Sequence, residues 1–253
     1  MYKFRILLIS FALAATLVPG VACAQLKVII SGGFSAAYQE LLPEFERTTG
    51  ITAETTRGGS VGSNPRTIPN QIRSGVEADV VILARQGLEE IREQGRILAG
   101  TDVDLARSII GMAVQAGAAK PDISTPEALT AVLLQAESVA VSSSTSGRYL
   151  TEELFPRLGI TAAMAGKTLT TGAIAVGRGE AEIGFQQVSE ILPIEGADLA
   201  GTIPEELQFE TTYSAAIITG SAQYESAKQL IEFLSSSEAA AAISKSGMEP
   251  VNR

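Results

Sequence analysis

Three short turns rich in glycine and hydroxyl groups hold the residues that could do chemistry in this chain. They span residues 31–35 (SGGFS), 58–64 (GGSVGSN) and 142–147 (SSSTSG). Each turn lies where a hydrophobic run ends and an amphipathic stretch begins, so each is expected at a helix N-terminus. Such ends present unpaired N–H groups and a partial positive charge, while glycine lets the backbone approach a ligand and hydroxyls add donors. The pattern indicates a site for a small anion.

Three turns together are stronger evidence than one. A single Ser–Gly turn is also an ordinary helix cap. Three of them, all expected at the carboxyl ends of strands, favour a shared site, because open sheets bind ligands at that edge. The ligand-binding residues predicted from the turns are Ser31, Gly33, Phe34, Ser60, Ser63, Ser144, Ser146 and Gly147. Phe34 is included for its backbone, since its side chain suits a wall or a core.

Two arginines, Arg57 and Arg148, lie beside the turns and are further ligand-binding candidates. A guanidinium forms a bidentate fork that suits a carboxylate. Arg66 lies beside the second turn. For all three arginines, the alternative is a solvated charge at a helix start.

A later segment, FQQVSE, supplies Gln186 and Gln187 as ligand-binding candidates and Glu190 as a candidate for catalysis. Consecutive residues of a strand point to opposite faces, so at most one of the two glutamines is expected to face the cleft. Tyr149 is the other catalytic candidate. The alternatives are a solvent-facing or capping role for Glu190 and a packing role for Tyr149.

Several kinds of chemistry lack the residues that they need. The chain has no histidine, and its single cysteine is Cys23. Transition-metal sites and Ser-His or Cys-His catalysis are therefore not expected. No P-loop, nucleophile elbow or dinucleotide fingerprint is present. We expect no metal and no cofactor, and any enzymatic base would be Glu, Asp, Tyr, Lys or Ser.

Residues 1–24 have the pattern of a secretory signal peptide. Lys3 and Arg5 precede an apolar run over residues 6–18, and Ala22-Cys23-Ala24 offers a cleavage site. The run is shorter than the about 20 residues of a spanning helix. Acylation at Cys23 is the alternative, which Gly20 disfavours because lipoproteins carry a large aliphatic residue there. We expect an exported, periplasmic protein without disulfides.

Net charge and aromatic content exclude some classes of binding partner. Removing a leader with two basic and no acidic residues changes the formal net charge from −9 to −11. Such a surface disfavours nucleic acid and anionic membranes, although donors inside a cleft could still hold an anion. Tryptophan is absent, which argues against a sugar-stacking site.

Hydrophobic and amphipathic stretches alternate in a pattern typical of an α/β fold with mainly parallel sheets. Strands are expected at residues 26–31, 51–56, 78–83, 108–115, 138–141, 182–186, 199–203 and 211–218. Helices are expected at residues 35–48, 65–74, 87–94, 147–158, 224–234 and 237–244, with one beginning at a capping sequence at 124–127 and another ending at 174–179.

Over residues 25–253 the chain resembles the type II periplasmic binding proteins, most nearly the molybdate-binding group. The likeness rests on the Gly-Phe-Ser helix start, on IPNQI and GVEADV within residues 68–80, and on GEAEIGF at 179–185. It implies two α/β lobes joined by two crossings, with the ligand cleft between them. Residues 25–106 and 211–253 would form lobe 1, and 107–210 lobe 2. It also implies an anion held by N–H and O–H groups. We expect a monomer that can serve an ABC transporter.

The chain departs from the molybdate binders at the ligand. Gly32-Gly33-Phe34 replaces their Ala-Ser-Leu and loses a hydroxyl, and Gln187 stands where they carry a tyrosine. The first turn and the FQQVSE segment together are similar to a side branch that includes the aconitate isomerases. We therefore favour periplasmic binding of a di- or tricarboxylate such as aconitate or citrate. Isomerisation of cis- and trans-aconitate in the same cleft and molybdate-type oxyanion uptake remain the alternatives.

Overall fold

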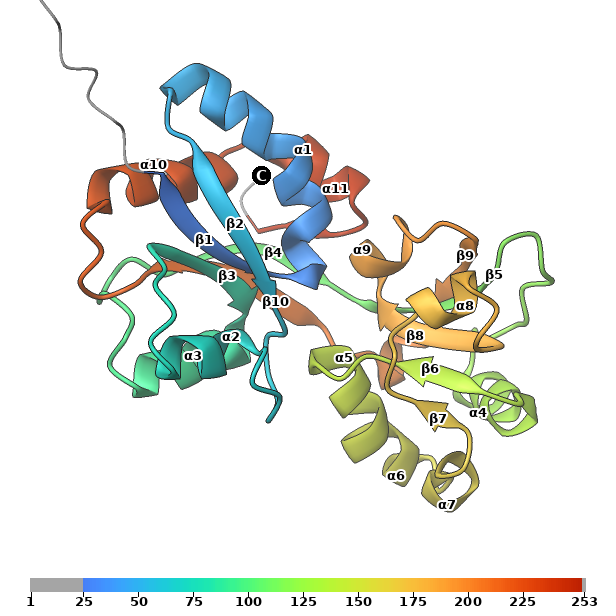
Figure 1. Cartoon of the computed structure of the whole chain (residues 1–253). Coiled ribbons are helices and arrows are strands. Elements are labelled where there is room, and N and C mark those ends of the chain that lie inside the picture. The colour runs from blue at the N-terminus through green and yellow to red at the C-terminus, as the bar shows by residue number, and fades with distance from the viewer. Residues whose placement is uncertain (1–24, 252–253) are drawn as a thin grey trace, which may run out of the picture.

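The computed structural model describes residues 25–251, which form two lobes connected by two chain crossings (Figure 1). The predicted signal peptide, with Cys23, lies outside the described residues. Within the described part of the chain, no helix is long and apolar enough to cross a membrane. The two-lobed α/β fold predicted from the sequence is confirmed.

The first lobe is built on a six-stranded sheet in the order β11-β4-β10-β3-β1-β2. Its strands are β1 (Leu26–Ser31), β2 (Ala53–Gly58), β3 (Val80–Ala84), β4 (Val103–Ser108), β10 (Thr211–Ile217) and β11 (Glu249–Pro250). One face is covered by α1 (Gly32–Thr49), α10 (Tyr224–Leu234) and α11 (Ala240–Lys245), and the other by α2 (Ile68–Arg73) and α3 (Arg85–Glu93).

The second lobe has a five-stranded sheet in the order β7-β6-β8-β5-β9. Its strands are β5 (Ile110–Gln115), β6 (Val139–Val141), β7 (Thr168–Leu169), β8 (Ile183–Gln187) and β9 (Ala197–Thr202). Its helices are α4 (Pro126–Gln135), α5 (Thr145–Arg148), α6 (Phe155–Arg157), α7 (Thr161–Met164), α8 (Ile174–Gly177) and α9 (Val188–Ile191), with a π-helical segment, Tyr149–Leu154, joining α5 to α6.

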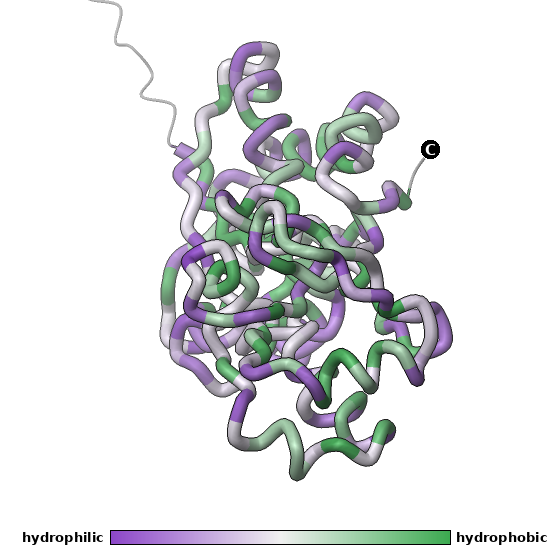
Figure 2. The backbone as a smooth tube through the Cα atoms, turned by 90° about the vertical axis from the view of Figure 1, so that its right-hand side faces the viewer, coloured by the Kyte–Doolittle hydropathy of each residue, from purple (hydrophilic) through white to green (hydrophobic). Residues whose placement is uncertain are grey.

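Successive residues of β1 pack on opposite faces of the first sheet, both of which are covered by helices. In β1, Val28 and Ile30 pack under α1 and α10, whereas Ile29 packs against α2 and α3. Side chains of a strand alternate between faces, so a strand that is covered on both sides needs a continuous hydrophobic run. Hydrophilic stretches of the chain recur on the outer helices and loops (Figure 2).

The prediction of mainly parallel sheets is wrong: both sheets are mixed, and the antiparallel ladders belong to the strands at the crossings. The β1–β2, β1–β3, β6–β7 and β6–β8 ladders are parallel, whereas β4 and β5 pair antiparallel with their neighbours. Only Ile109 separates β4 from β5, so the chain passes directly from one sheet into the other. The second crossing follows β9 and leads into β10. Both proposed lobe boundaries stay predictions. The boundary at 210/211 agrees with this strand membership, whereas the boundary at 106/107 cuts β4, whose residues Arg107 and Ser108 still pair with β10 in the lobe-1 sheet.

The sequence pattern missed three strands. β4 contains Asp104 and Arg107 among its apolar residues, so its sequence lacks the hydrophobic run that predicts a strand. In the structure, Arg85 pairs with Asp104. The other two, β7 and β11, have two residues each, too few for a periodic pattern.

Candidate functional site

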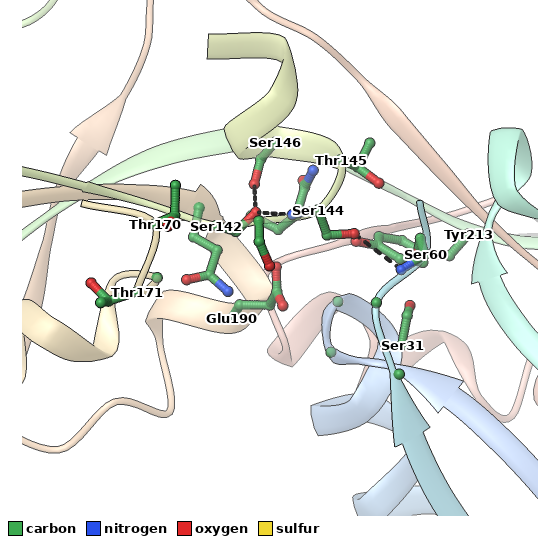
Figure 3. A pocket seen from close by; sticks show the side chains of 18 residues that line it. Ser31, Ser60, Ser142, Ser144, Thr145, Ser146, Thr170, Thr171, Glu190 and Tyr213 are labelled. Atoms are coloured by element: carbon green, nitrogen blue, oxygen red, sulfur yellow. Dashed lines mark hydrogen bonds between the residues drawn. The ribbon is translucent and has the colours of Figure 1, made fainter. Parts of the chain in front are cut away.

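A cavity of about 230 Å³ lies between the two lobes, where the three predicted turns meet (Figure 3). It is smaller than the about 300–1,000 Å³ of pockets for drug-sized ligands, so it suits a small solute. Its walls are formed by Ser31, Gly32, Gly33, Gly58, Gly59, Ser60, Ser142, Ser143, Ser144, Thr145, Ser146, Thr170, Thr171, Gly172, Gln186, Gln187, Glu190 and Tyr213.

The lobe-1 wall consists of the ends of β1 and β2. Ser31 is the N-cap of α1, and its side chain makes no capping hydrogen bond. Ser60 follows β2, and its buried Oγ accepts the N–H of Ala84 at 3.0 Å. This bond ties the second turn to the end of β3, and the paired strands β1 and β2 carry lining residues at their carboxyl ends.

The lobe-2 wall is organised around the hydroxyl of Ser142. Its Oγ accepts the N–H groups of Ser144 and Gly147, each at 3.2 Å, and lies 3.2 Å from the Oγ of Ser146. A Cβ on Gly147 would overlap with the carbonyl oxygen of Ser142, so glycine allows α5 to start this close to the turn. The loop between β7 and α8 adds Thr170, Thr171 and Gly172.

The lobes touch across the cavity. The backbone N–H of Ser60 donates to the Oγ of Ser144 at 3.0 Å, and the N–H of Val61 approaches the same oxygen at 3.4 Å. These two donors lie in lobe 1 and the acceptor in lobe 2. The second and third turns thus contact each other directly.

Three buried polar atoms at the cavity lack a hydrogen-bond partner within the described residues. They are the Oγ of Ser31, the Oγ1 of Thr145 and the Oε1 of Gln187. An unsatisfied buried polar atom costs about 1–3 kcal/mol, and most such atoms in proteins are paired. Their presence on both walls indicates that a ligand or water completes this site.

The electrostatics of the cavity depend on one carboxyl group. No Lys or Arg is among the residues that line it, whereas Glu190 projects into it from α9 (Figure 3). Burial raises the pKa of Glu190 to about 7, against the opposing effect of hydrogen bonds from the Gln186 side chain and the Gln187 backbone. Near neutral pH this group can therefore both accept and release a proton.

Two adjacent glycines make room for the ionisable groups. A Cβ on Gly32 would overlap with Oε1 of Glu190, and a Cβ on Gly33 would overlap with the hydroxyl of Tyr213. Any side chain at either position would therefore displace one of these groups. The Gly-Gly pair opens the N-terminus of α1 to a carboxyl group and a phenol.

Of the residues predicted from sequence, eight line the cavity: Ser31, Gly33, Ser60, Ser144, Ser146, Gln186, Gln187 and Glu190. Both glutamines line it, although strict alternation allows only one. The reason is that Gln187 ends β8 and is the N-cap of α9, where the backbone leaves the strand geometry. Gln187 also donates to Thr211 at the second crossing, at 2.9 Å.

Other predicted residues lie away from the cavity wall. Phe34 is fully buried in the lobe-1 core, and Ser63 is exposed. The N–H of Gly147 is already bonded to Ser142. Arg148 pairs with Glu152 at 2.9 Å, and the hydroxyl of Tyr149 donates to the carbonyl of Leu207 at 2.7 Å. The last two side chains are therefore engaged by other residues of the second lobe.

Arg57 lines a vestibule beside the cavity rather than the cavity itself. The vestibule shares Gly32, Gln186 and Glu190 with the cavity, and Arg57 is the cation among the residues that line it. Its exposed guanidinium can meet a ligand group that extends beyond the inner cavity.

Sequence reasoning missed several lining residues. Thr170-Thr171-Gly172 is a fourth hydroxyl- and glycine-rich turn before a helix, so the same rule could have found it. Tyr213 lies in an ordinary hydrophobic strand, and no local signal distinguishes it. Its place depends on the second crossing, which brings the start of β10 next to α9.

The fold and this interlobe cavity define a two-lobed solute-binding protein. The chain belongs to the family of bacterial extracellular solute-binding proteins, whose family model matches residues 26–249.

Among individual relatives, the chain is 40% identical over 230 residues to an aconitate isomerase from a Pseudomonas species, covering 89% of this chain and 88% of that protein. The sulfate-binding protein SubI from Mycobacterium tuberculosis matches with a TM-score of 0.71 at 14% identity, over 90% of this chain and 87% of that one. The periplasmic molybdate-binding protein of Azotobacter vinelandii matches with a TM-score of 0.65 at 19% identity, over 88% and 98%. The two structures share the fold, and the predicted resemblance is confirmed.

Proposed function

We propose that the protein binds a small tricarboxylate between its lobes in the periplasm and isomerises it, interconverting cis- and trans-aconitate. The observation that carries this proposal is the buried carboxyl group of Glu190 in the cavity. A carboxylate against a bound anion repels it, by about 4 kcal/mol for unit charges 4 Å apart at an effective dielectric of 20. A site that served only to carry anions would gain nothing from this group. A carboxyl group with a pKa of about 7 is suited to proton transfer instead.

The reaction needs only the movement of one proton along an allylic system. Ionised Glu190 would remove a proton from the methylene carbon of aconitate, and the electron pair would delocalise over the double bond and a carboxylate as an enolate. The resulting acid then returns a proton to the carbon at the other end, and the double bond shifts. One C–H bond breaks and one forms, with no oxidant, reductant or cofactor.

The remaining groups of the cavity would hold the substrate. The free hydroxyls of Ser31 and Thr145 face it from opposite lobes and can donate to carboxylate oxygens. Arg57 in the vestibule would bind a carboxylate that extends outward. Such a division suits a tricarboxylate better than a tetrahedral oxyanion, which the inner cavity alone would contain.

Incubation of the purified protein with cis-aconitate, followed by chromatography of the trans isomer, tests the activity. Glu190→Gln keeps the shape of the side chain and removes the base, so kcat should fall by about 10²–10⁴-fold. Glu195→Gln, an exposed carboxyl on the following loop, is the matched control and should keep the wild-type rate. Wild-type turnover by the Glu190 variant would contradict the assignment.

The second candidate is a binding protein that delivers its solute to an ABC transporter. Family membership and the neutral donors of the inner cavity favour it. Calorimetry with citrate, cis-aconitate and molybdate separates the cases. Tight carboxylate binding without turnover would support delivery of a carboxylate, and tight molybdate binding without a carboxylate response would support oxyanion uptake.

A further inference from the structure

Tyr213 is an ionisable group of the cavity that the proton transfer described above leaves unused. Its ring is packed in the lobe-1 core, and the residue is 3% exposed. Its hydroxyl nevertheless lies at the cavity, in the space that a side chain at Gly33 would fill. Within residues 25–251, no hydrogen bond to this hydroxyl is formed. The phenol ring is buried in the core, and its hydroxyl at the cavity has no partner in this described part of the chain. This hydroxyl is therefore available to a ligand.

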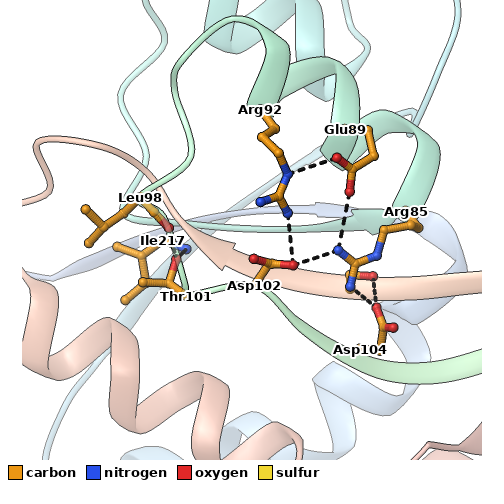
Figure 4. A network of polar contacts seen from close by, with 9 residues as sticks. Arg85, Glu89, Arg92, Leu98, Thr101, Asp102, Asp104 and Ile217 are labelled. Carbon is orange, nitrogen blue, oxygen red and sulfur yellow. Dashed lines mark hydrogen bonds and ion pairs between the residues drawn. The ribbon is translucent and has the colours of Figure 1, made fainter.

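Tyr213 lies next to a local irregularity of β10. The register with β4 shifts between Tyr213, which lies opposite Ala106, and Ser214, which lies opposite Asp104. Ser214 is fully buried and donates to Asp104 at 2.6 Å, and Asp104 is also held by Arg85. Figure 4 shows this arginine between Asp104, Asp102 and Glu89. Such a bulge, anchored on its far side, can re-aim the neighbouring side chain.

Tyr213 and Glu190 come from opposite lobes and meet at one helix end. Each occupies the space beside one of two consecutive glycines at the start of α1, the carboxyl group beside Gly32 and the phenol beside Gly33. The two groups are therefore neighbours along the same wall and can contact the same small ligand (Figure 3).

We propose that Tyr213 is a further catalytic residue, whose hydroxyl donates a hydrogen bond to the substrate carboxylate on which enolate charge develops. This role rests on the proposed isomerisation. Burial, together with the charge of Glu190, raises the pKa of Tyr213 well above its ordinary value, so the phenol keeps its proton at neutral pH. A donor aimed at charge that appears only in the transition state accelerates the reaction more than it strengthens binding.

Both lobes contribute to this pair. The base comes from α9 of lobe 2 and the donor from β10 of lobe 1.

Tyr213→Phe tests the role, because it removes the hydroxyl and keeps the ring in the core. The variant should lower kcat for cis-aconitate by about 10²–10³-fold. Its affinity for tricarballylate, a saturated tricarboxylate that cannot react, should change less than about fivefold in calorimetry. Tyr38→Phe is the matched control, since its hydroxyl also lies in lobe 1 but bonds to Thr55 at 2.9 Å; it should keep wild-type kcat. Thermal unfolding verifies that each variant folds.

The outcomes separate this inference from the proposed function. An active wild type with a fully active Tyr213→Phe variant overturns the inference and leaves the isomerase intact. Equal losses of kcat and of tricarballylate affinity also overturn it, because they assign the hydroxyl to ground-state binding. A wild type that binds tricarboxylates but never isomerises them overturns both. Loss of kcat alone supports the role.

Discussion

At the scale of single residues, two glycines leave the space that the ionisable side chains of the site occupy. Gly32 and Gly33 carry no side chain, and Glu190 and Tyr213 fill the space beside them. A sequence comparison sees only a lost hydroxyl at this turn. The structure adds that a carboxyl group and a phenol occupy this space, so two ionisable groups lie at the start of α1.

The buried carboxyl group of Glu190 should also make the free energy of unfolding depend on pH. The pKa of Glu190 is about 7 in the folded protein, above its ordinary value of 4.5. Between these values the unfolded chain loses its proton first, so the free energy of unfolding decreases as pH rises from about 4.5 to about 7 and then levels off. Glu190→Gln cannot titrate. It should therefore gain about 1–3 kcal/mol relative to wild type at about pH 8.5 and little at about pH 4.

Urea denaturation of both proteins at the two pH values measures this difference, and all other titrating groups cancel in the comparison. A stability difference between variant and wild type that does not change with pH would show that the carboxyl group has an ordinary pKa.

At the scale of elements, the start of α5 is the most tightly built part of the site. The hydroxyl of Ser142 holds two backbone N–H groups, and the helix begins so close to this turn that only glycine fits at position 147. The sequence motif SSSTSG therefore does two tasks. Ser142 and Gly147 shape the turn, and the hydroxyls of Ser144, Thr145 and Ser146 face the cavity.

Gly147→Ala should be costly for this reason. Its Cβ would overlap with backbone atoms of Ser142, which cannot rotate away, so we expect a loss of about 1–3 kcal/mol in the free energy of unfolding and weaker ligand binding. Gly166→Ala, with nothing within 4 Å of its Cβ, is the control and should be neutral or slightly stabilising. Urea titrations of both variants give the answer, and equal stability of the two would remove the steric argument.

At the scale of the whole molecule, we infer that function depends on an equilibrium between open and closed lobes. Within the described residues, the cavity is bounded by both lobes, and the bonds from Ser60 and Val61 to Ser144 join them directly across it. A ligand that contacts both walls shifts this equilibrium by its differential affinity for the closed form.

Ser144→Ala should weaken the closed state. It removes the acceptor of both interlobe N–H groups, so the ligand-free protein should show a larger radius of gyration in small-angle X-ray scattering. Tricarboxylate affinity should fall about tenfold, which corresponds to about 1.4 kcal/mol. Ser63→Ala, an exposed serine of the facing loop, should behave as wild type. An unchanged radius of gyration for Ser144→Ala would mean that this contact does not hold the lobes together.

The sequence by itself determined the class of fold and the region of the site. Continuous hydrophobic runs such as that of β3 require burial on both faces, and glycine- and hydroxyl-rich turns after them mark the edge where ligands bind. These are local properties of the chain, so local patterns are enough to find them. Ser31, Ser60 and Ser146, predicted from these turns, all line one cavity.

Only the tertiary structure decided which groups of each turn face the ligand and which ionisable residues join them. Ser60 lies inside and Ser63 outside on one loop, and Arg148 pairs with its own helix. Glu190 and Tyr213 become neighbours because the second crossing returns the chain to lobe 1 beside α9. Contacts between residues of different lobes depend on how the lobes pack and close. No local period in the sequence encodes that packing, and so the proposed catalytic pair could be found only in the structure.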